Sequence, residues 1–412
     1  MTISKLFLAA MAIAACSHAP IIENDAPAPV AASKGARIER AAKRERTWAD
    51  TIKPLSAMSK GWNRVPGPEG TGCVQDSTYT FKVLPGLPDK VLIYLNGGGA
   101  CWRTAECDPK RAAYPVDDDS PVNDVSTRLG IFDYNNESNP FKAYTIVFVN
   151  YCTADMHLGA LEVTYDGSDS KVKGAKSRTF AIRHGGAANL EAVLDYFYRN
   201  VRAPGTIFVA GSNTGAVASP VVAARMARHY PRARVVQLGE GAGAYSAVDE
   251  PDMFSSWGAI DYLHTDPAFR EVDSADFSFV KLYTIAGSSA KNLHFAQLNS
   301  VEDPSQLAFL TMAGVKGTSV RKELATNVDS LRAGLPWFRF YAVPGKAASI
   351  LRTNLLYSTT VEGTPLTDWI SKLADGDDVD DVGSALLTAP EPRTPAKPAA
   401  KPPAAKGKPK KR

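Results

Sequence analysis

The 412-residue sequence predicts an α/β fold with a mostly parallel central sheet and helices on both faces. Between Trp48 and about Val382, short runs of β-branched and aromatic residues alternate with helical patterns. These runs are apolar along nearly their whole length, which is typical of parallel strands covered on both faces. A hydrophobic content of 44% is sufficient for one large core. The expected strands are 90–95, 144–150, 205–211, 233–239, 279–287 and 338–345.

Two helices are predicted on either side of the strand 205–211. Apolar residues recur at helical spacing over 189–197, and again over 217–226. Because strand and helix alternate without an internal repeat, we expect one α/β domain over residues 48–388.

The segment after strand 205–211 has the pattern of a nucleophile elbow. Residues 211–215 read Gly-Ser-Asn-Thr-Gly and lead directly into the second predicted helix. In hydrolases with the G-x-S-x-G motif, this strand–turn–helix geometry exposes a nucleophilic serine. Aligned on the two glycines, the central residue here is Asn213.

A glycine run follows the strand 90–95, at residues 97–99. Glycines just past a sheet strand can present bare backbone N–H groups to an oxyanion. We expect Gly98, Gly99 and the N–H of Thr214 to form this group of donors. The alternative is that the run is only a tight turn.

Several segments, in order, resemble the pectinacetylesterase/Notum family of carboxylesterases. The resemblance extends from about Gly61 to Val382 and implies an α/β-hydrolase-like fold. It also implies a Ser/Asp/His triad and the removal of acetyl or fatty-acyl groups from carbohydrate or protein. The matching segments are 61–73, 94–107, 131–141, 151–160, 183–196, 208–215, 297–309 and 338–351, of which the triple-glycine/cysteine and YCT-D-HLG blocks are the most specific.

Carried over by position, the triad of the family is incomplete in this chain. The aspartate falls on Asp303, which is present, but the serine falls on Asn213 and the histidine on Ala348. Acyl transfer by this route needs an oxygen nucleophile, a base and a carboxylate that orients the base. Losing nucleophile and base together costs on the order of a million-fold in turnover. A further departure is Glu240-Gly241, where family members usually read Asp-Ser.

Other side chains are candidate substitutes for the missing groups or candidate ligand contacts. Ser212 is one residue from the apex, and its side chain is expected to point away from the cleft. Trp102 and His157 lie in family segments near the mouth of the site and are candidate ligand contacts, although a structural role for His157 is equally open. His294, nine residues before Asp303, is the candidate substitute base.

The first sixteen residues predict export and lipidation. One lysine precedes an apolar run too short to span a bilayer, which ends in small residues and Cys16. Ile13-Ala14-Ala15-Cys16 resembles the bacterial lipobox, so residues 1–16 are expected to be a signal peptide with Cys16 acylated. The alternative is an ordinary signal peptide. Ser17, where Asp is absent, resembles lipoproteins of the outer membrane, the expected location.

Four cysteines remain, which is an even number in an exported protein and suits two disulfides. Three pairings are open, and the short loop between Cys101 and Cys107 favours that pair together with Cys73–Cys152. A metal site is the competing interpretation of four cysteines, but no CxxC pair or histidine cluster supports it. We expect no metal and no cofactor.

Both ends of the chain are predicted to lie outside the domain. Residues 17–47 are rich in Ala, Pro and mixed charge and are expected to be a flexible tether. Residues 389–412 carry eight Lys and Arg against one Glu, a net +7 within a chain of +4, so the remainder is about −3. This Pro/Ala/Lys tail is expected to be disordered and to meet anionic envelope polymers or lipid head groups, not nucleic acid. The alternative is a solubilising tail.

Three functions follow as hypotheses. The first is a catalytically degenerate envelope lipoprotein that binds an acylated or carbohydrate ligand. The second is an active carboxylesterase that removes acyl groups from polysaccharide. The third is a structural tether held at one end by the acyl anchor at Cys16 and at the other by the basic tail.

Overall fold

The computed structural model describes residues 47–75, 77–110, 112–166, 179–248 and 251–390, which belong to one compact unit. The predicted signal peptide with Cys16, nearly all of the tether and nearly all of the basic tail lie outside the described residues. Among the described residues, no helix is both long enough and apolar enough to cross a membrane.

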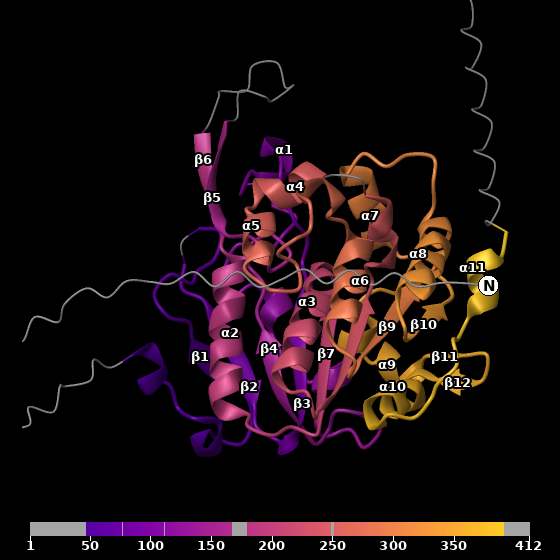
Figure 1. The fold of residues 1–412 in the computed structure, drawn as a ribbon, viewed down its shortest axis with the longest axis horizontal. Helices are drawn as coiled ribbons and strands as arrows, with labels where there is room; N and C mark the ends of the chain where they lie inside the picture. Colours follow the sequence, from indigo (N-terminus) through magenta and orange to yellow (C-terminus); the bar gives the residue numbers. More distant parts are fainter. Residues whose placement is uncertain (1–46, 76, 111, 167–178, 249–250, 391–412) are drawn as a thin grey trace, which may run out of the picture. The chain divides into compact units, whose positions relative to one another are not determined.

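The centre of the domain is an eight-stranded sheet in the order β1-β2-β4-β3-β7-β8-β9-β10 (Figure 1). The six strands from β4 to β10 in this order are parallel to one another, while β1 and β2 add an antiparallel edge next to β4. Two small antiparallel sheets pair β5 with β6 and β11 with β12. The strands are β1 Asn63–Pro66, β2 Thr80–Leu84, β3 Leu87–Leu95, β4 Tyr144–Val149, β5 Leu161–Asp166, β6 Thr179–His184, β7 Thr206–Ser212, β8 Arg234–Glu240, β9 Leu293–Ser300, β10 Phe338–Val343, β11 Thr360–Val361 and β12 Thr364–Pro365.

Helices cover both faces of this sheet, as predicted. Successive side chains of β3 point to opposite faces: Ile93 joins a core cluster with α2, α3, α6 and α8, whereas Tyr94 joins a second cluster with α10. The α-helices are α1 Thr104–Cys107, α2 Gly186–Asn200, α3 Thr214–His229, α4 Pro251–Ser256, α5 Ala259–His264, α6 Phe279–Ser289, α7 Pro304–Met312, α8 Val320–Gly334, α9 Leu355–Ser358, α10 Leu366–Asp375 and α11 Ser384–Thr388.

The predicted strand 279–287 is wrong, because these residues form α6. Phe279, Leu282, Tyr283 and Ala286 are buried at helical spacing, and the Ser278 side chain caps the helix by accepting a hydrogen bond from the backbone N–H of Lys281. The strand that belongs at this place in the sheet is β9, Leu293–Ser300. Its mixture of apolar and amide side chains gave no continuous apolar run.

The parallel arrangement gathers five loops at one edge of the sheet. Strands β3, β7, β8, β9 and β10 are consecutive neighbours, so the segments after their carboxyl ends lie side by side. Those segments begin at Asn96, Asn213, Gly241, Val301 and Pro344.

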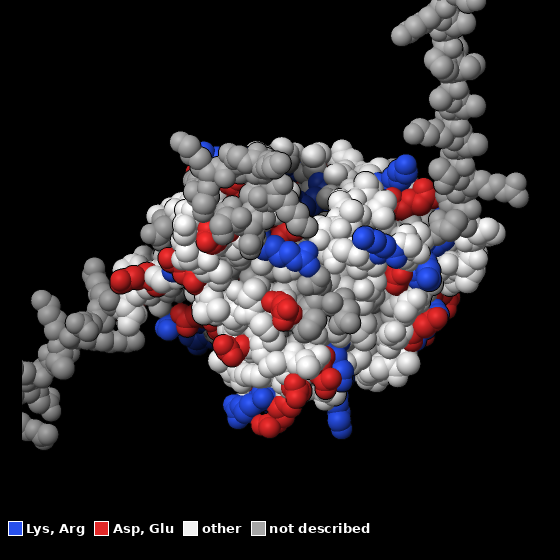
Figure 2. Space-filling model, turned by 90° about the horizontal axis from the view of Figure 1, so that it is seen from above, with Lys and Arg blue, Asp and Glu red and all other residues white. Residues whose placement is uncertain are grey.

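Charged side chains on the visible surface are mixed in sign. Seen from above, Lys and Arg alternate with Asp and Glu over the described residues (Figure 2). This distribution agrees with a domain whose net charge is small once the basic tail is set apart.

Candidate functional site

Asn213 occupies the apex of the turn between β7 and α3. Its backbone has φ 56° and ψ −121°, which is strained for a residue with a Cβ atom. The N–H of Asn213 donates to the carbonyl of Glu240 at 2.7 Å, which ties the turn to the end of β8. The predicted elbow geometry is therefore present, with an amide at the position of the nucleophile.

A tyrosine orients the Asn213 amide. Tyr245, in the 3-10 helix η6 (Gly243–Ala247), donates its hydroxyl to Asn213 Oδ1 at 2.7 Å. Since the oxygen of the amide is engaged by Tyr245, its two N–H groups are directed elsewhere. Nothing in the sequence motifs indicated Tyr245, because it reaches Asn213 across 32 residues.

The glycine loop after β3 packs against the elbow. A Cβ on Gly97 would lie 2.1 Å from the carbonyl oxygen of Ser212, so only glycine fits there. Gly98, predicted as an oxyanion donor, instead donates its N–H to Thr214 Oγ1 at 3.1 Å. The N–H of Gly99 has no acceptor in the described part of the chain, and Thr214, as the first residue of α3, has no intrahelical acceptor. Of these two residues, Thr214 is fully buried, and Gly99 is the one that lines the pocket described below.

Asp303 lies at the carboxyl edge of β9, where it caps α7. Its Oδ1 accepts from the N–H of Ser305 at 2.7 Å, and its Oδ2 lies 3.5 Å from Gln306 Nε2. Burial raises the pKa of this carboxyl group. Gly241, directly after the end of β8, lies next to this carboxyl group, since a Cβ on Gly241 would lie 3.4 Å from Asp303 Oδ2.

Ala348 lies in the loop after β10, beside the loop that carries Asp303. The N–H of Glu302 donates to the carbonyl of Gly345 at 3.0 Å and joins the two loops. The next residue, Ser349, has φ 55° and lines the same pocket as Asn213. The three triad positions are thus on neighbouring loops, and a methyl group occupies the position of the base.

A pocket of about 360 Å³ opens between these loops. It is formed by the glycine loop and the elbow, by one side of α7, and by the loop after β10. The lining residues are Asn96, Gly97, Gly98, Gly99, Ala100, Ala113, Val122, Ser212, Asn213, Tyr245, Ser305, Ala308, Phe309, Met312, Ser349 and Arg352. Asp303 and Ala348 are not among them.

Ser212 lines the pocket, and its hydroxyl belongs to a buried hydrogen-bond network. It accepts from the Tyr94 hydroxyl at 2.6 Å and donates to the Glu240 carboxylate. Glu240 also accepts from the N–H of Leu351 at 3.2 Å, and burial raises its pKa to about 7. The Ser212 hydroxyl is therefore fixed by two buried partners, Tyr94 and Glu240.

His294 is not placed to act as the substitute base. It lies near the amino end of β9 and pairs with Val236, whereas Leu298 pairs with Glu240 beside the elbow. Four residues of strand, about 13 Å, separate the two positions. His294 Nδ1 accepts from Arg234 at 3.0 Å, and burial together with the charge of Arg234 lowers its pKa. The prediction that singled out His294 is wrong.

The two expected ligand contacts lie behind the pocket wall. His157 is buried, its Nε2 lies 2.7 Å from the Asn96 carbonyl, and burial lowers its pKa to about 4. Trp102 is also buried and packs on Phe309, with 5.9 Å between ring centroids. Neither residue lines the pocket, so both support its walls. The expectation that they contact a ligand directly is therefore wrong.

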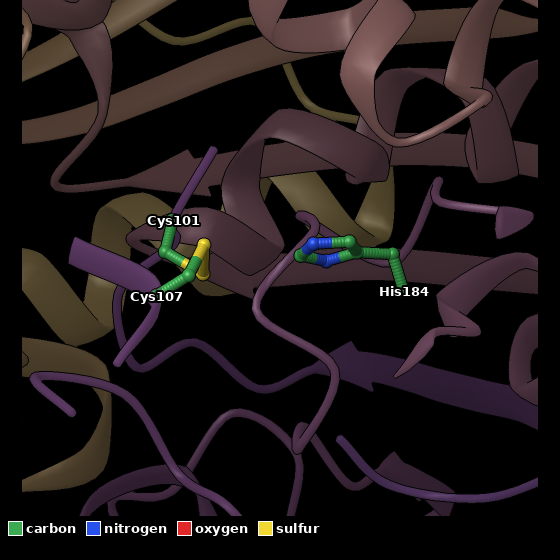
Figure 3. A group of neighbouring side chains, drawn as sticks. All are labelled: Cys101, Cys107 and His184. Atoms are coloured by element: carbon green, nitrogen blue, oxygen red, sulfur yellow. A yellow bond between two sulfur atoms is a disulfide. The ribbon is translucent and has the colours of Figure 1, made fainter. Parts of the chain in front are cut away.

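Both disulfides are those favoured by the sequence, Cys73–Cys152 and Cys101–Cys107. The second lies beside the ring of His184, at the end of β6 (Figure 3). Both sulfurs are committed to the disulfide, and the His184 nitrogens face the Tyr165 hydroxyl at 2.9 Å and the Thr153 carbonyl at 3.1 Å. This group therefore stabilises the loop and offers no thiolate to a metal.

Comparisons with known proteins agree with this geometry. Residues 69–268 match the family described as Pectinacetylesterase, a range that contains the glycine loop and the elbow and ends before Asp303. The solved structure of the Wnt deacylase Notum from Drosophila superposes with a TM-score of 0.54 at 15% identity, covering 78% of this chain and 96% of that chain. No curated protein matches the sequence.

Proposed function

We propose that the chain is a catalytically degenerate member of the pectinacetylesterase family, whose model matches residues 69–268, and that it binds an acylated or carbohydrate ligand. The observation that carries the proposal is the pair of substitutions Asn213 and Ala348 within segments that otherwise resemble the family. An amide has no proton that a base could usefully remove, and alanine cannot act as a base. The pocket itself remains open to solvent-borne ligands.

The hydrogen bonds of the side chains near Asn213 support the proposal that catalytic activity has been lost. Ser212 is bonded to Tyr94 and Glu240, and Ser219 is fully buried with its hydroxyl on the Ala216 carbonyl. Among the described histidines, His157 is buried behind the pocket and His294 lies at the other end of its strand. Neither histidine is hydrogen-bonded to a hydroxyl that lines the pocket, because His157 contacts the Asn96 carbonyl and His294 contacts Arg234. The carboxylate bonded to the Ser212 hydroxyl is the buried Glu240.

Hydrolysis of a small aryl acetate tests the proposal. We expect the purified chain and its Asp303→Ala variant to give the same rate, because a triad acid without nucleophile or base has nothing to orient. We also expect no labelling by a fluorophosphonate. Hydrolysis that falls on Asp303→Ala, or labelling lost on Ser212→Ala or Ser219→Ala, would show that the chain is an active carboxylesterase instead.

We further propose that the chain is an envelope lipoprotein anchored through Cys16 and assisted by its basic tail. The support is the lipobox-like Ile13–Cys16 sequence after an apolar run, and the net charge of +7 carried by residues 389–412. Metabolic labelling with an alkyne fatty acid tests the anchor, and we expect the label to be lost in Cys16→Ser. Label retained in that variant would contradict acylation at this residue.

A further inference from the structure

We infer that the pocket takes a free carboxylate carried on a short apolar chain, and that it selects this group over the corresponding ester. The inference rests on the proposed binding function and names its ligand class. Three properties of the pocket carry it: the charge of its lining, the donors at the elbow, and the apolar side formed by α7.

The charge of the lining is positive. Arg352 is the only charged residue among the sixteen that line the pocket. A ligand group placed there meets one permanent positive charge and no carboxylate. An anionic group gains from this field, whereas an ester or alcohol gains only the hydrogen bonds.

Arg352 is held in place before a ligand arrives. Its Nη1 donates to Asn96 Oδ1 at 2.6 Å and its Nη2 to the Asp124 carbonyl at 3.4 Å, while the guanidinium lies over the rings of Phe132 and Phe148 at 5.9 and 5.7 Å. It forms no ion pair with a carboxylate of the described residues within 4.0 Å. The charge is thus fixed at low entropic cost and remains to be neutralised.

With asparagine at position 213, the donors at the elbow suit a carboxylate ligand better than they would with serine at this position. Tyr245 holds Asn213 Oδ1, which leaves the amide N–H groups of Asn213 as donors. Gly99 lines the same pocket, and its N–H has no acceptor among the described residues. In a hydrolase position 213 would carry a nucleophile that must stay close to a neutral carbonyl carbon. Here an amide donor replaces it, and a carboxylate offers two oxygens that can accept from these groups.

Two buried acidic residues lie behind the residues that line the pocket. Their negative charges would weaken the binding of an anion if they were exposed to it. Glu240 is 3% exposed and bonded to Ser212 and Leu351, and Asp303 is 2% exposed and bonded to Ser305. Neither lines the pocket. Arg352, which does line it, is therefore the charge that a ligand meets first.

One side of the pocket is apolar. Ala308, Phe309 and Met312 of α7 line it, with Ala113 and Val122 from the loops between β3 and β4. Phe309 is fixed by the rings of Tyr245 and Trp102 at 4.0 and 5.9 Å. The flexible Met312 can adapt to an aliphatic chain. An amphipathic monocarboxylate therefore satisfies both parts of the pocket.

Calorimetric titration with octanoate, methyl octanoate and 1-octanol tests this inference. We use the full chain with Cys16→Ser, which removes the predicted acylation site and the need for detergent. Octanoate is expected to bind about tenfold or more tightly than either neutral probe. Arg352→Gln should weaken the binding of octanoate by about tenfold and leave the binding of the neutral probes unchanged. Arg352→Lys should weaken octanoate binding less than Arg352→Gln does. Asn213→Ala should weaken octanoate binding several-fold. Arg199→Gln, on the exposed surface of α2, is the matched control and should change nothing.

The outcomes separate the inference from the proposed function. Equal binding of octanoate and methyl octanoate by the unsubstituted pocket, or binding unchanged in a folded Arg352→Gln, overturns the carboxylate inference and leaves the binding function standing. No binding of any probe also overturns the inference. Hydrolysis of methyl octanoate that depends on Asp303 would instead overturn the proposed function.

Discussion

At the scale of single residues, Asn213 shows how a strained turn can persist without its reaction. The backbone of the elbow is held by hydrogen bonds that do not involve a nucleophile, from Asn213 N–H to Glu240 and from Gly98 N–H to Thr214. Asparagine tolerates positive φ better than most residues with a Cβ atom. The amide oxygen also has a partner, because it accepts a hydrogen bond from the Tyr245 hydroxyl.

The Tyr245 hydroxyl is predicted to stabilise the site. Tyr245→Phe removes the 2.7 Å bond to Asn213 and leaves a partly buried amide oxygen without its donor. We expect a loss of about 1 kcal/mol in the free energy of unfolding, measured by urea denaturation. Tyr134→Phe is the control, since that ring contacts Arg128 and its hydroxyl has no partner in the described residues. Equal effects of both changes would contradict a specific role for the Tyr245 hydroxyl.

Glu240 is predicted to make stability depend on pH. Burial raises its pKa from 4.5 to about 7 in the folded chain, so the folded state binds its proton more tightly than the unfolded state. Stability from this group is therefore present at low pH and is lost as pH rises from about 4.5 through about 7, by on the order of 3 kcal/mol. Glu240→Gln removes the charge and keeps the shape.

The difference in unfolding free energy between the chain and Glu240→Gln isolates this effect. We expect the variant to gain stability relative to the parent as pH rises from 5 to 8, because only the parent must bury a charge at high pH. Other groups, such as His157, titrate in both proteins and cancel in the difference. A constant difference across this range would show that Glu240 stays charged at all these pH values.

At the scale of elements, the apolar runs that became β3, β4, β7, β8 and β10 could be predicted because each is buried on both faces and close to continuous in sequence. The run 279–287 has the same composition and became α6, since composition does not distinguish a short buried strand from a buried helix. β9 could not be predicted from an apolar run, because amide side chains such as Gln297 interrupt it. Gln297 accepts a hydrogen bond from Asn327 of α8.

The candidate site was only partly predictable for a related reason. Asn213, Asp303 and Ala348 follow from motifs that are local in sequence. Tyr245 and Arg352 enter through contacts that only the folded sheet creates, such as that between Arg352 and Asn96 across 256 residues. The sequence also could not exclude His294 as a base. Its distance from the site depends on where β9 begins, and the strand begins at Leu293.

The two disulfides are predicted to differ in their contribution to stability. Cys73–Cys152 closes a separation of 79 residues and joins the segment after β1 to that after β4, whereas Cys101–Cys107 spans only 6. Loop-closure entropy gives about 4 kcal/mol for the long loop and about 2 kcal/mol for the short one. Denaturation of Cys73→Ala/Cys152→Ala and of Cys101→Ala/Cys107→Ala should show this order. The reverse order would mean that local packing around His184 outweighs loop closure.

At the scale of the whole molecule, the chain combines a domain of small net charge with a basic end. Residues 389–412 carry +7, so their removal should change association with anionic surfaces without unfolding the domain. We expect a chain ending at Pro390 to keep its melting temperature and to bind less to vesicles containing phosphatidylglycerol, with a difference that shrinks as salt rises. Equal binding by both chains at low salt would favour a tail that serves only solubility.

The site has lost its nucleophile and its base, and the most direct test is to measure ester hydrolysis after both groups are restored. We predict that Asn213→Ser and Ala348→His, each alone, leave aryl acetate hydrolysis at the background of the parent chain, because each restores only one of two groups that act as a unit. The double variant Asn213→Ser/Ala348→His should hydrolyse the ester above background and lose that rate on Asp303→Ala. A parent chain that already hydrolyses the ester in an Asp303-dependent manner would contradict the account.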